Sequence, residues 1–314
     1  MSPTLHDILA AAERIKPHAH RTPILTNESL NRKVGARVFL KCENFQKVGA
    51  FKFRGACNAV FSLSHVEASR GVCTHSSGNH AQALALAAKL RNIPAYIVMP
   101  NNAPEVKKNA VKGYGGQITF CAPTLEAREA MLRHIVERTG ATVIHPYDDE
   151  RVIAGQGTAA LELLEDVPDL DVILAPVGGG GLISGTAIAA TEIKKGIRVI
   201  AGEPEMADDA YRSWKEGTII PSTNPKTIAD GLLTSLGKLT FPIIQQRVEQ
   251  IVTVSEQGII EAMRFIWERA KIVIEPSAAV AVGVLWEKKI DLSGLKVGVI
   301  LSGGNVDLEK LPWQ

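Results

Sequence analysis

The chain has 314 residues, of which 46% are hydrophobic and 22% charged, a composition typical of a globular protein with one large or two ordinary domains. Its 35 basic and 33 acidic residues give a formal net charge of +2, and no block of like charge stands out. This balance gives no electrostatic reason to expect nucleic acid or an anionic membrane as a partner. No apolar run is long enough to span a bilayer, so no membrane is expected.

The cysteines are few and widely spaced, with no C-x-x-C pair, and Cys57 and Cys73 lie in apolar stretches typical of a core. At this chain length the pattern favours a reduced cytoplasmic enzyme over a disulfide scaffold. The histidines are scattered and do not indicate a zinc site.

From residue 70 onward, short runs rich in β-branched residues alternate with longer amphipathic segments. The expected strands are Gly71–His75, Ala95–Met99, Gln117–Cys121, Thr142–His145, Asp171–Val177, Arg198–Glu203 and Lys296–Leu301. The expected helices between them include Asn79–Leu90, Pro104–Tyr114, Leu125–Arg138 and Ala154–Leu164. This alternation predicts an α/β fold in which doubly wound parallel sheets are covered by helices on both faces.

Neither an internal repeat nor a Pro- or Ser-rich linker divides the chain. A second domain is therefore expected as an insertion in the first. We place the small domain at residues 71–147, where strand and helix units follow in quick succession. Residues 1–70 and 148–314 then form the large domain.

Three glycine-bearing polar loops directly follow expected strands, at residues 76–80, 178–181 and 302–305. Open parallel sheets bind ligands at the carboxyl ends of their strands, so these loops are where a site is expected.

The loop Gly178-Gly179-Gly180-Gly181 precedes a helix expected from about Leu182. Bare backbone N–H groups and the positive end of the helix dipole would together bind a phosphate without a basic side chain. A tight turn is the structural alternative. A dinucleotide-binding loop is another, since Glu203 lies near the ~20-residue spacing of the acidic residue that binds ribose, although the third glycine of G-x-G-x-x-G is missing.

Lys52 lies between Phe51 and Phe53 in an otherwise apolar stretch. Apolar surroundings lower the pKa of a lysine, and a neutral amine is the form that condenses with an aldehyde to a Schiff base. A surface lysine flanked by core phenylalanines is the alternative interpretation.

The loop Ser76-Ser77-Gly78-Asn79 opens an alanine-rich helix. Serine and asparagine are common helix caps, so capping alone would explain them. The same free N–H groups could hold a substrate carboxylate, with the Ser77 hydroxyl as acid or base and Asn79 bonded to a cofactor oxygen.

Several motifs in order along the chain resemble those of the serine racemase and serine/threonine dehydratase family. They are Phe51-Lys-Phe-Arg-Gly-Ala56, His75-Ser-Ser-Gly-Asn-His80, the four glycines, Ser302-Gly-Gly-Asn-Val-Asp307, Arg21-Thr-Pro-Ile24, Ile153-Ala-Gly-Gln-Gly-Thr158, Thr227-Ile-Ala-Asp-Gly231 and Glu275-Pro276. The resemblance covers essentially the whole chain. It implies a pyridoxal phosphate (PLP) fold of the tryptophan-synthase-β type, with the cofactor in the cleft between the two domains.

The resemblance also assigns roles to the loop residues. Lys52 would carry PLP, Gly178 to Gly181 would bind its phosphate, Asn79 would contact the ring hydroxyl and Ser302 the ring nitrogen. A serine at that nitrogen does not favour a protonated ring, which makes the cofactor a milder electron sink. The substrate would be held by Ser76, Ser77, Gly78, Asn79 and His80, with Lys52 and Ser77 on opposite faces of its α-carbon.

The resemblance implies a homodimeric enzyme that acts on small amino acids. We expect it to racemise serine and to eliminate water from L-serine and related hydroxy amino acids, giving a keto acid and ammonia. A threonine or 3-hydroxyaspartate dehydratase without significant racemase activity is the alternative within the class. A nicotinamide-dependent oxidoreductase and a non-catalytic sensor are the alternatives from other classes.

The family resemblance further implies a divalent cation bound by Glu203, the Ala207 carbonyl and Asp209. Oxygen-only ligands suit Mg²⁺ or Ca²⁺, although an acidic loop that caps the next helix would look the same. ATP activation also occurs in the family, and the positions that match it here are Lys47, Tyr114, Lys271 and Asn305.

Two positions bear on substrate choice. Tyr147 stands where animal members of the family typically have asparagine, so cofactor and substrate contacts there are expected to differ. Arg128, in the expected helix Leu125–Arg138, could meet a second substrate carboxylate and favour 3-hydroxyaspartate, or be an exposed helix arginine.

Overall fold

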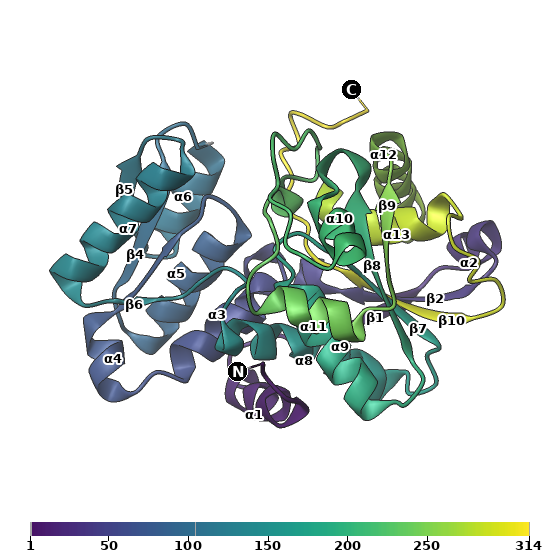
Figure 1. The fold of residues 1–314 in the computed structure, drawn as a ribbon, viewed down its shortest axis with the longest axis horizontal. Coiled ribbons are helices and arrows are strands. Elements are labelled where there is room, and N and C mark those ends of the chain that lie inside the picture. Colours follow the sequence, from purple (N-terminus) through teal and green to yellow (C-terminus); the bar gives the residue numbers. More distant parts are fainter. Residues whose placement is uncertain (1, 104, 314) are drawn as a thin grey trace.

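A computed structural model describes residues 2–103 and 105–313, which form two lobes, each around its own sheet (Figure 1). The larger sheet has the order β1-β2-β10-β7-β8-β9. Its strands are β1 (Ile24–Thr26), β2 (Arg37–Cys42), β7 (Val172–Pro176), β8 (Arg198–Pro204), β9 (Gln250–Val254) and β10 (Lys296–Leu301). Every neighbouring pair is parallel except β1 and β2.

The smaller sheet is wholly parallel and has the order β5-β4-β3-β6. Its strands are β3 (Val72–His75), β4 (Ala95–Pro100), β5 (Gln117–Cys121) and β6 (Thr142–Val143). The expected parallel sheets are thus confirmed, and all seven expected strands are present. Strands β1, β2 and β9 are not among those expected from the sequence, and β6 ends at Val143, short of the expected His145. His145 instead turns the chain, because its Nδ1 atom accepts the backbone N–H of Asp148 at 2.9 Å.

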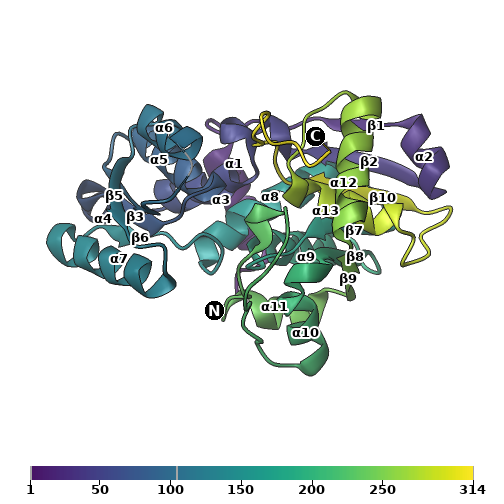
Figure 2. The same ribbon diagram turned by 90° about the horizontal axis from the view of Figure 1, so that it is seen from above.

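Helices cover both faces of the larger sheet, as the two views show (Figures 1 and 2). One face packs against α1 (Leu5–Ile15), α8 (Glu150–Asp166), α9 (Gly181–Ile193), α10 (Asp209–Glu216) and α11 (Thr240–Arg247). The other face packs against α2 (Glu28–Val34), α12 (Glu256–Phe265) and α13 (Pro276–Trp286). Within β7, Val172 and Leu174 pack on the face covered by α13, whereas Ile173 and Ala175 pack on the face covered by α8 and α9. Because both faces of this strand are buried, the strand is apolar throughout.

The smaller sheet is covered in the same way. On one face lie α3 (Lys52–Phe61), α4 (His65–Arg70), α5 (Asn79–Arg91) and α6 (Glu105–Gly113), and on the other lies α7 (Leu125–Thr139). The expected start of α6 at Pro104 lies outside the described residues. Helix α3 packs against both α5 and α8, so it lies at the junction of the lobes.

Short irregular helices complete the chain. They are η1 (Glu43–Phe45), η2 (Lys47–Gly49), η3 (Glu205–Ala207), η4 (Asp230–Leu232) and the π-helical η5 (Ile266–Ala270). The core beneath the smaller sheet includes Phe53, Val60 and Ala68, which precede residue 71. The domain boundary at residue 71 stays a prediction. None of the helices in the described ranges is long and apolar enough to cross a membrane.

Candidate active site

The carboxyl ends of neighbouring strands bring the predicted loops together. Strands β10 and β7 are adjacent in the larger sheet, so Ser302 and the glycine loop, which directly follow them, lie at the same sheet edge. From the smaller sheet, the loop after β3 reaches this edge, because the Asn79 side chain bonds to Glu275 at the start of α13. The candidate site is therefore the space where the carboxyl ends of the two sheets face each other.

Lys52 is partly buried at this junction, at the first residue of α3. Its ammonium donates to the carbonyl of Pro146 at 2.7 Å, and the ring of Phe51 lies 5.1 Å away. Burial lowers the pKa of Lys52 to about 8, and the charge of Glu275 opposes this change. The lowered pKa that the sequence indicated is thus present, although Phe53 points into the core of the small lobe and not toward the amine.

The four glycines after β7 are all buried. Among the described residues, none accepts a hydrogen bond from the backbone N–H groups of Gly178 to Gly181. Buried N–H groups are almost always paired in folded proteins, so unpaired ones at the start of α9 indicate a binding position for an anion. Gly180 has φ of +92°, and a Cβ on Gly179 would lie 2.3 Å from the ring of Tyr147, so side chains are excluded here.

Loop 234–240 supports the glycine loop from outside. Thr240 donates from Oγ1 to the carbonyl of Gly179 at 2.8 Å. Asp148 in turn accepts the backbone N–H groups of Lys238, at 3.1 Å, and Leu239, at 2.8 Å. Since Asp148 follows Tyr147, the segment that leaves the small lobe is tied through residues 238–240 to the predicted phosphate loop.

Ser302 is buried beside the start of α3, where its carbonyl accepts the N–H of Phe51 at 2.9 Å. The next residue, Gly303, leaves room for Glu275, because a Cβ there would lie 2.7 Å from Oε1. Glu275 accepts Asn79 Nδ2 at 3.0 and 3.2 Å and the backbone N–H of Asn305 at 3.1 Å. Burial raises the pKa of Glu275 to about 7, against the lowering effect of the bond from Asn79.

The loop after β3 does not cap its helix. The N-cap of α5 is Gly78, which has no side chain, and within the described part of the chain no side-chain capping bond is made there, so the capping interpretation of Ser77 and Asn79 is wrong. Ser76 Oγ accepts the N–H of Gly78 at 3.3 Å, while Ser77 is partly buried. The buried His80 places Nε2 3.1 Å from the Ile144 carbonyl, and its Nδ1 has no partner among the described residues. Burial lowers the pKa of His80 to about 3, and the Lys52 charge contributes.

The predicted metal ligands lie at the end of β8, which contains Glu203, and in the segment after it, where Ala207 ends η3 and Asp209 begins α10. Glu203 is buried, and its two carboxylate oxygens accept the N–H groups of Ala210 and Tyr211, each at 2.7 Å. Burial raises the pKa of Glu203 to about 9 and that of Asp209 to about 6. Asp209 Oδ2 is buried without a partner in the described chain. The described residues hold no group of three or more His, Cys, Asp and Glu side chains arranged for a metal, and the predicted set has two side chains and the Ala207 carbonyl.

Arg128, in the first turn of α7, differs from the exposed helix arginine considered above. It is partly buried, and its Nε atom is buried without a partner among the described residues. Burial lowers the pKa of His75, and the charge of Arg128 lowers it further, which places the arginine near the residue that precedes Ser76. The charge of Arg128 is therefore felt at the strand end that precedes the predicted substrate loop, and one of its guanidinium nitrogens is unpaired among the described residues.

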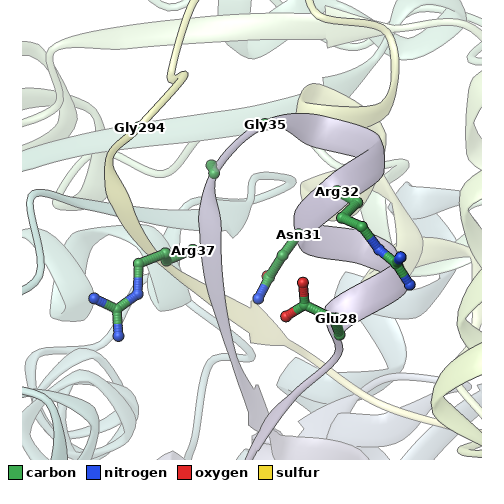
Figure 3. Close-up of a pocket in the computed structure, with 7 residues that line it drawn as sticks. Glu28, Asn31, Arg32, Gly35, Arg37 and Gly294 are labelled. Atoms are coloured by element: carbon green, nitrogen blue, oxygen red, sulfur yellow. The ribbon is translucent and has the colours of Figure 1, made fainter.

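A separate hollow at the surface lies away from this junction. It is lined by Glu28, Asn31, Arg32, Gly35, Ala36, Arg37 and Gly294 (Figure 3). Arg37 begins β2, whereas Ser302 and the glycine loop follow the ends of strands parallel to β2. The hollow thus lies at the opposite edge of the sheet from the chemistry, and we assign it no part in the site.

Two residues at the junction were not recognised from the sequence as parts of one network. From the sequence, Glu275 appears only as part of a motif, and Asn305 as part of the motif after Ser302 and as a nucleotide position. The signal for Glu275 was an acidic residue between the apolar run Ile272–Ile274 and Pro276, which begins α13. A carboxylate so placed is buried and needs polar partners.

Comparisons with known proteins agree with this geometry. The family model described as "Pyridoxal-phosphate dependent enzyme" matches residues 15–303. The chain is 53% identical over 311 residues to the β-hydroxyaspartate dehydratase of Paracoccus denitrificans, covering 99% of both chains. It is 50% identical to the L-threo-3-hydroxyaspartate ammonia-lyase of Saccharomyces cerevisiae, covering 98% of this chain and 96% of the relative.

Among solved structures, serine racemase from Dictyostelium discoideum superimposes with a TM-score of 0.94 at 51% identity, covering 98% of this chain and 100% of the other. The chain belongs to the family of pyridoxal-phosphate dependent enzymes. PLP is therefore its cofactor, and the dinucleotide-binding interpretation of the glycine loop is set aside.

Proposed function

We propose that the chain eliminates water from small β-hydroxy amino acids and racemises serine, with Lys52 as the lysine that carries PLP. The observation that carries this proposal is the pairing of an amine of lowered pKa with buried, unpaired glycine N–H groups at one junction. When bound, PLP supplies an aldehyde for amino groups and a ring that withdraws electrons from the substrate α-carbon. The glycine N–H groups suit its phosphate, and Asn79 and Ser302 suit its ring.

In this proposal the chain's own groups move the protons. The Lys52 amine takes the α-proton of an L-amino acid on one face, since its lowered pKa leaves a usable neutral fraction near neutral pH. The Ser77 hydroxyl delivers a proton on the other face, which inverts the centre. When the β-hydroxyl leaves as water instead, hydrolysis returns that water and yields a keto acid plus ammonia.

A second substrate, 3-hydroxyaspartate, is favoured by a specific observation. The free, buried Nε of Arg128 near His75 offers a charged partner for a second carboxylate. The relatives from P. denitrificans and S. cerevisiae are named for this substrate class. We propose that 3-hydroxyaspartate is dehydrated more efficiently than serine.

The test is a product analysis of the PLP-loaded protein with L-serine, threonine and 3-hydroxyaspartate, quantifying keto acid, ammonia and D-serine in each sample. The proposal expects oxaloacetate from 3-hydroxyaspartate, and both pyruvate and D-serine from L-serine. Lys52→Ala should lose all products and the visible absorbance band of bound PLP. Product formation by that variant, or trapping of PLP on another lysine by borohydride, would remove Lys52 from its role.

We propose that Mg²⁺ or Ca²⁺ binds at the end of β8 and the segment that follows it. The buried, unpartnered Asp209 Oδ2 and the buried Glu203 carboxylate are oxygen ligands whose charge a cation would offset. The carbonyl of Ala207 is the third protein ligand in this proposal.

We further propose that ATP binds near η2. Asn305 donates to the carbonyl of Val48 at 2.7 Å, beside Lys47, and Tyr114 packs against the core that contains Val48. Lys271 completes the set that the family resemblance implied. Isothermal titration calorimetry with ATP tests this proposal, and the heat of ATP binding should be lost in Lys47→Ala.

The homodimer and the cytoplasmic location are proposals as well. Phe45 and Val273 are 45% and 44% exposed, and the bond from Asn44 Nδ2 to the Val273 carbonyl brings their two segments close, which supports an interface with a second copy on this side. Cys42, Cys57, Cys73 and Cys121 are all free, as expected of a reducing compartment. Analytical ultracentrifugation of the wild type and Phe45→Ser tests the dimer.

A further inference from the structure

Four charged side chains form a buried cluster behind Lys52 that the proposed reaction does not use. Arg54, Lys41 and Glu43 are fully buried, and Glu162 is 16% exposed at its side chain. Two positive and two negative groups make the cluster electrically neutral. Buried charges need this kind of compensation, because an unpaired one is strongly destabilising.

Arg54 is the centre of the cluster. Its Nε and Nη2 atoms donate to the two oxygens of Glu43 at 2.7 and 2.9 Å. Its Nη1 and Nη2 atoms donate to the two oxygens of Glu162, both at 2.8 Å, and Nη1 also reaches Thr158 at 3.2 Å. All five guanidinium N–H groups therefore have acceptors, in two bidentate pairs that fix the plane of the group.

The start of α3 is also held to the large lobe by backbone contacts, because the N–H of Phe51 donates to the Ser302 carbonyl at 2.9 Å and Ala50 forms a β-bridge with Gly303. Its N-cap, Phe51, makes no side-chain bond to the helix terminus. Residues two apart on a helix point to nearly opposite sides. The side chain of Arg54 therefore binds its partners on the side of the first turn opposite to the side chain of Lys52. Glu43 follows β2 and Glu162 lies on α8, which places both anchors in the large lobe.

We infer that Arg54 is a positioning residue that fixes Lys52 in the frame of the large lobe. Helix α3 also packs on α5 of the small lobe, and the ion pairs of Arg54 add the side-chain restraint that ties its first turn to the large lobe. The ion pairs of Arg54 keep Lys52 at a fixed position relative to the glycine loop and Ser302 when the small lobe moves. The inference rests on the proposed role of Lys52.

The test uses Arg54→Lys, which keeps the charge but replaces the planar fork by a point charge. Arg91→Lys is the matched control, because Arg91 bonds to the carbonyls of Val60 and Leu63 at the other end of α3. Both variants should lower the melting temperature. Only Arg54→Lys should slow the appearance of the visible PLP band, by at least about tenfold, when PLP is added to the apoprotein.

A second readout needs no cofactor. In the apoprotein, the pH dependence of Lys52 acylation, read by peptide mass spectrometry, should move to higher pH in Arg54→Lys and stay unchanged in Arg91→Lys. If Arg54→Lys does not fold, Glu43→Gln takes its place, because it removes the charge of one bidentate partner of Arg54. This variant should show a smaller decrease in the rate of PLP-band formation and a smaller shift of Lys52 acylation to higher pH.

Two results would overturn the inference. One is a wild-type rate of PLP-band formation in the variant, and the other is an unchanged acylation profile despite a lowered melting temperature. Borohydride trapping of PLP on a different lysine in the wild type would instead contradict the proposed function. The acylation profile would still decide whether Arg54 positions Lys52.

Discussion

Asn79 donates from one amide nitrogen to both carboxylate oxygens of Glu275, at 3.0 and 3.2 Å, and so joins the first residue of α5 to the start of α13. The bond spans the two lobes at the level of Lys52. Asn305 completes the contact by donating to the Asn79 side-chain oxygen at 3.0 Å. A predicted cofactor contact is thereby held in place by a carboxylate from the opposite lobe.

Glu275→Gln should flatten the pH dependence of stability. The folded-state pKa of about 7 lies above the ordinary 4.5, so the destabilisation from ionising Glu275 is absent below pH 4.5, grows up to about pH 7 and is complete above it. Glutamine cannot ionise, so the melting temperature should fall less between pH 5 and 8. Thermal unfolding at several pH values measures this, with the exposed Glu126→Gln as control. Parallel curves for the wild type and Glu275→Gln would contradict the buried, raised pKa.

Ser77→Ala should abolish formation of D-serine while some dehydration of L-serine remains. The two outcomes share removal of the α-proton by Lys52, but only inversion needs a second proton carrier on the other face. Chiral chromatography and a keto-acid assay on the same sample give the ratio, with dehydration as the internal control. Unchanged production of D-serine would show that another group carries the proton.

Arg128→Met should reduce kcat/KM for 3-hydroxyaspartate by roughly 10- to 150-fold, the loss expected for a charge-assisted bond of about 1.5–3 kcal/mol. Turnover of serine, which lacks the second carboxylate, should change less than about threefold. Arg133→Met is the control on the same helix, because that arginine is exposed and pairs only distantly with Glu129, at 3.9 Å. Equal losses for both substrates would place Arg128 outside substrate recognition.

Added Mg²⁺ should raise the melting temperature of the wild type and leave that of Glu203→Gln unchanged. A ligand at a hundredfold excess over its Kd stabilises the folded state by about 2.7 kcal/mol, and the variant lacks a charged ligand. Thermal unfolding with Mg²⁺, Ca²⁺ and a chelator measures the effect. Glu205→Gln, an exposed acid in the same loop, should respond like the wild type. A variant that is stabilised as strongly as the wild type would place the cation elsewhere.

Most of the fold was readable from the sequence because its strands are short, apolar and separated by amphipathic helices. The parallel sheets and the glycine loop after β7 followed from that alternation alone. Two of the three missed strands had weak local signals: β1 has three residues and pairs antiparallel at the sheet edge, and β2 has a charged residue at its start and Lys41 inside it. Lys41 is a buried charge whose partner, Glu162, lies 121 residues away.

The sequence by itself determined which residue types could do the chemistry: a lysine among apolar neighbours, glycines with free N–H groups and a serine after a strand. Only the tertiary structure decided how they meet. The lowered pKa of Lys52 needs burial between two lobes, and the bond between Asn79 and Glu275 joins residues 196 apart. Arg128 becomes a candidate for substrate binding only because its charge acts on His75. Contacts between distant segments and the loss of water around them have no local sequence signal, because both arise when separate elements pack together.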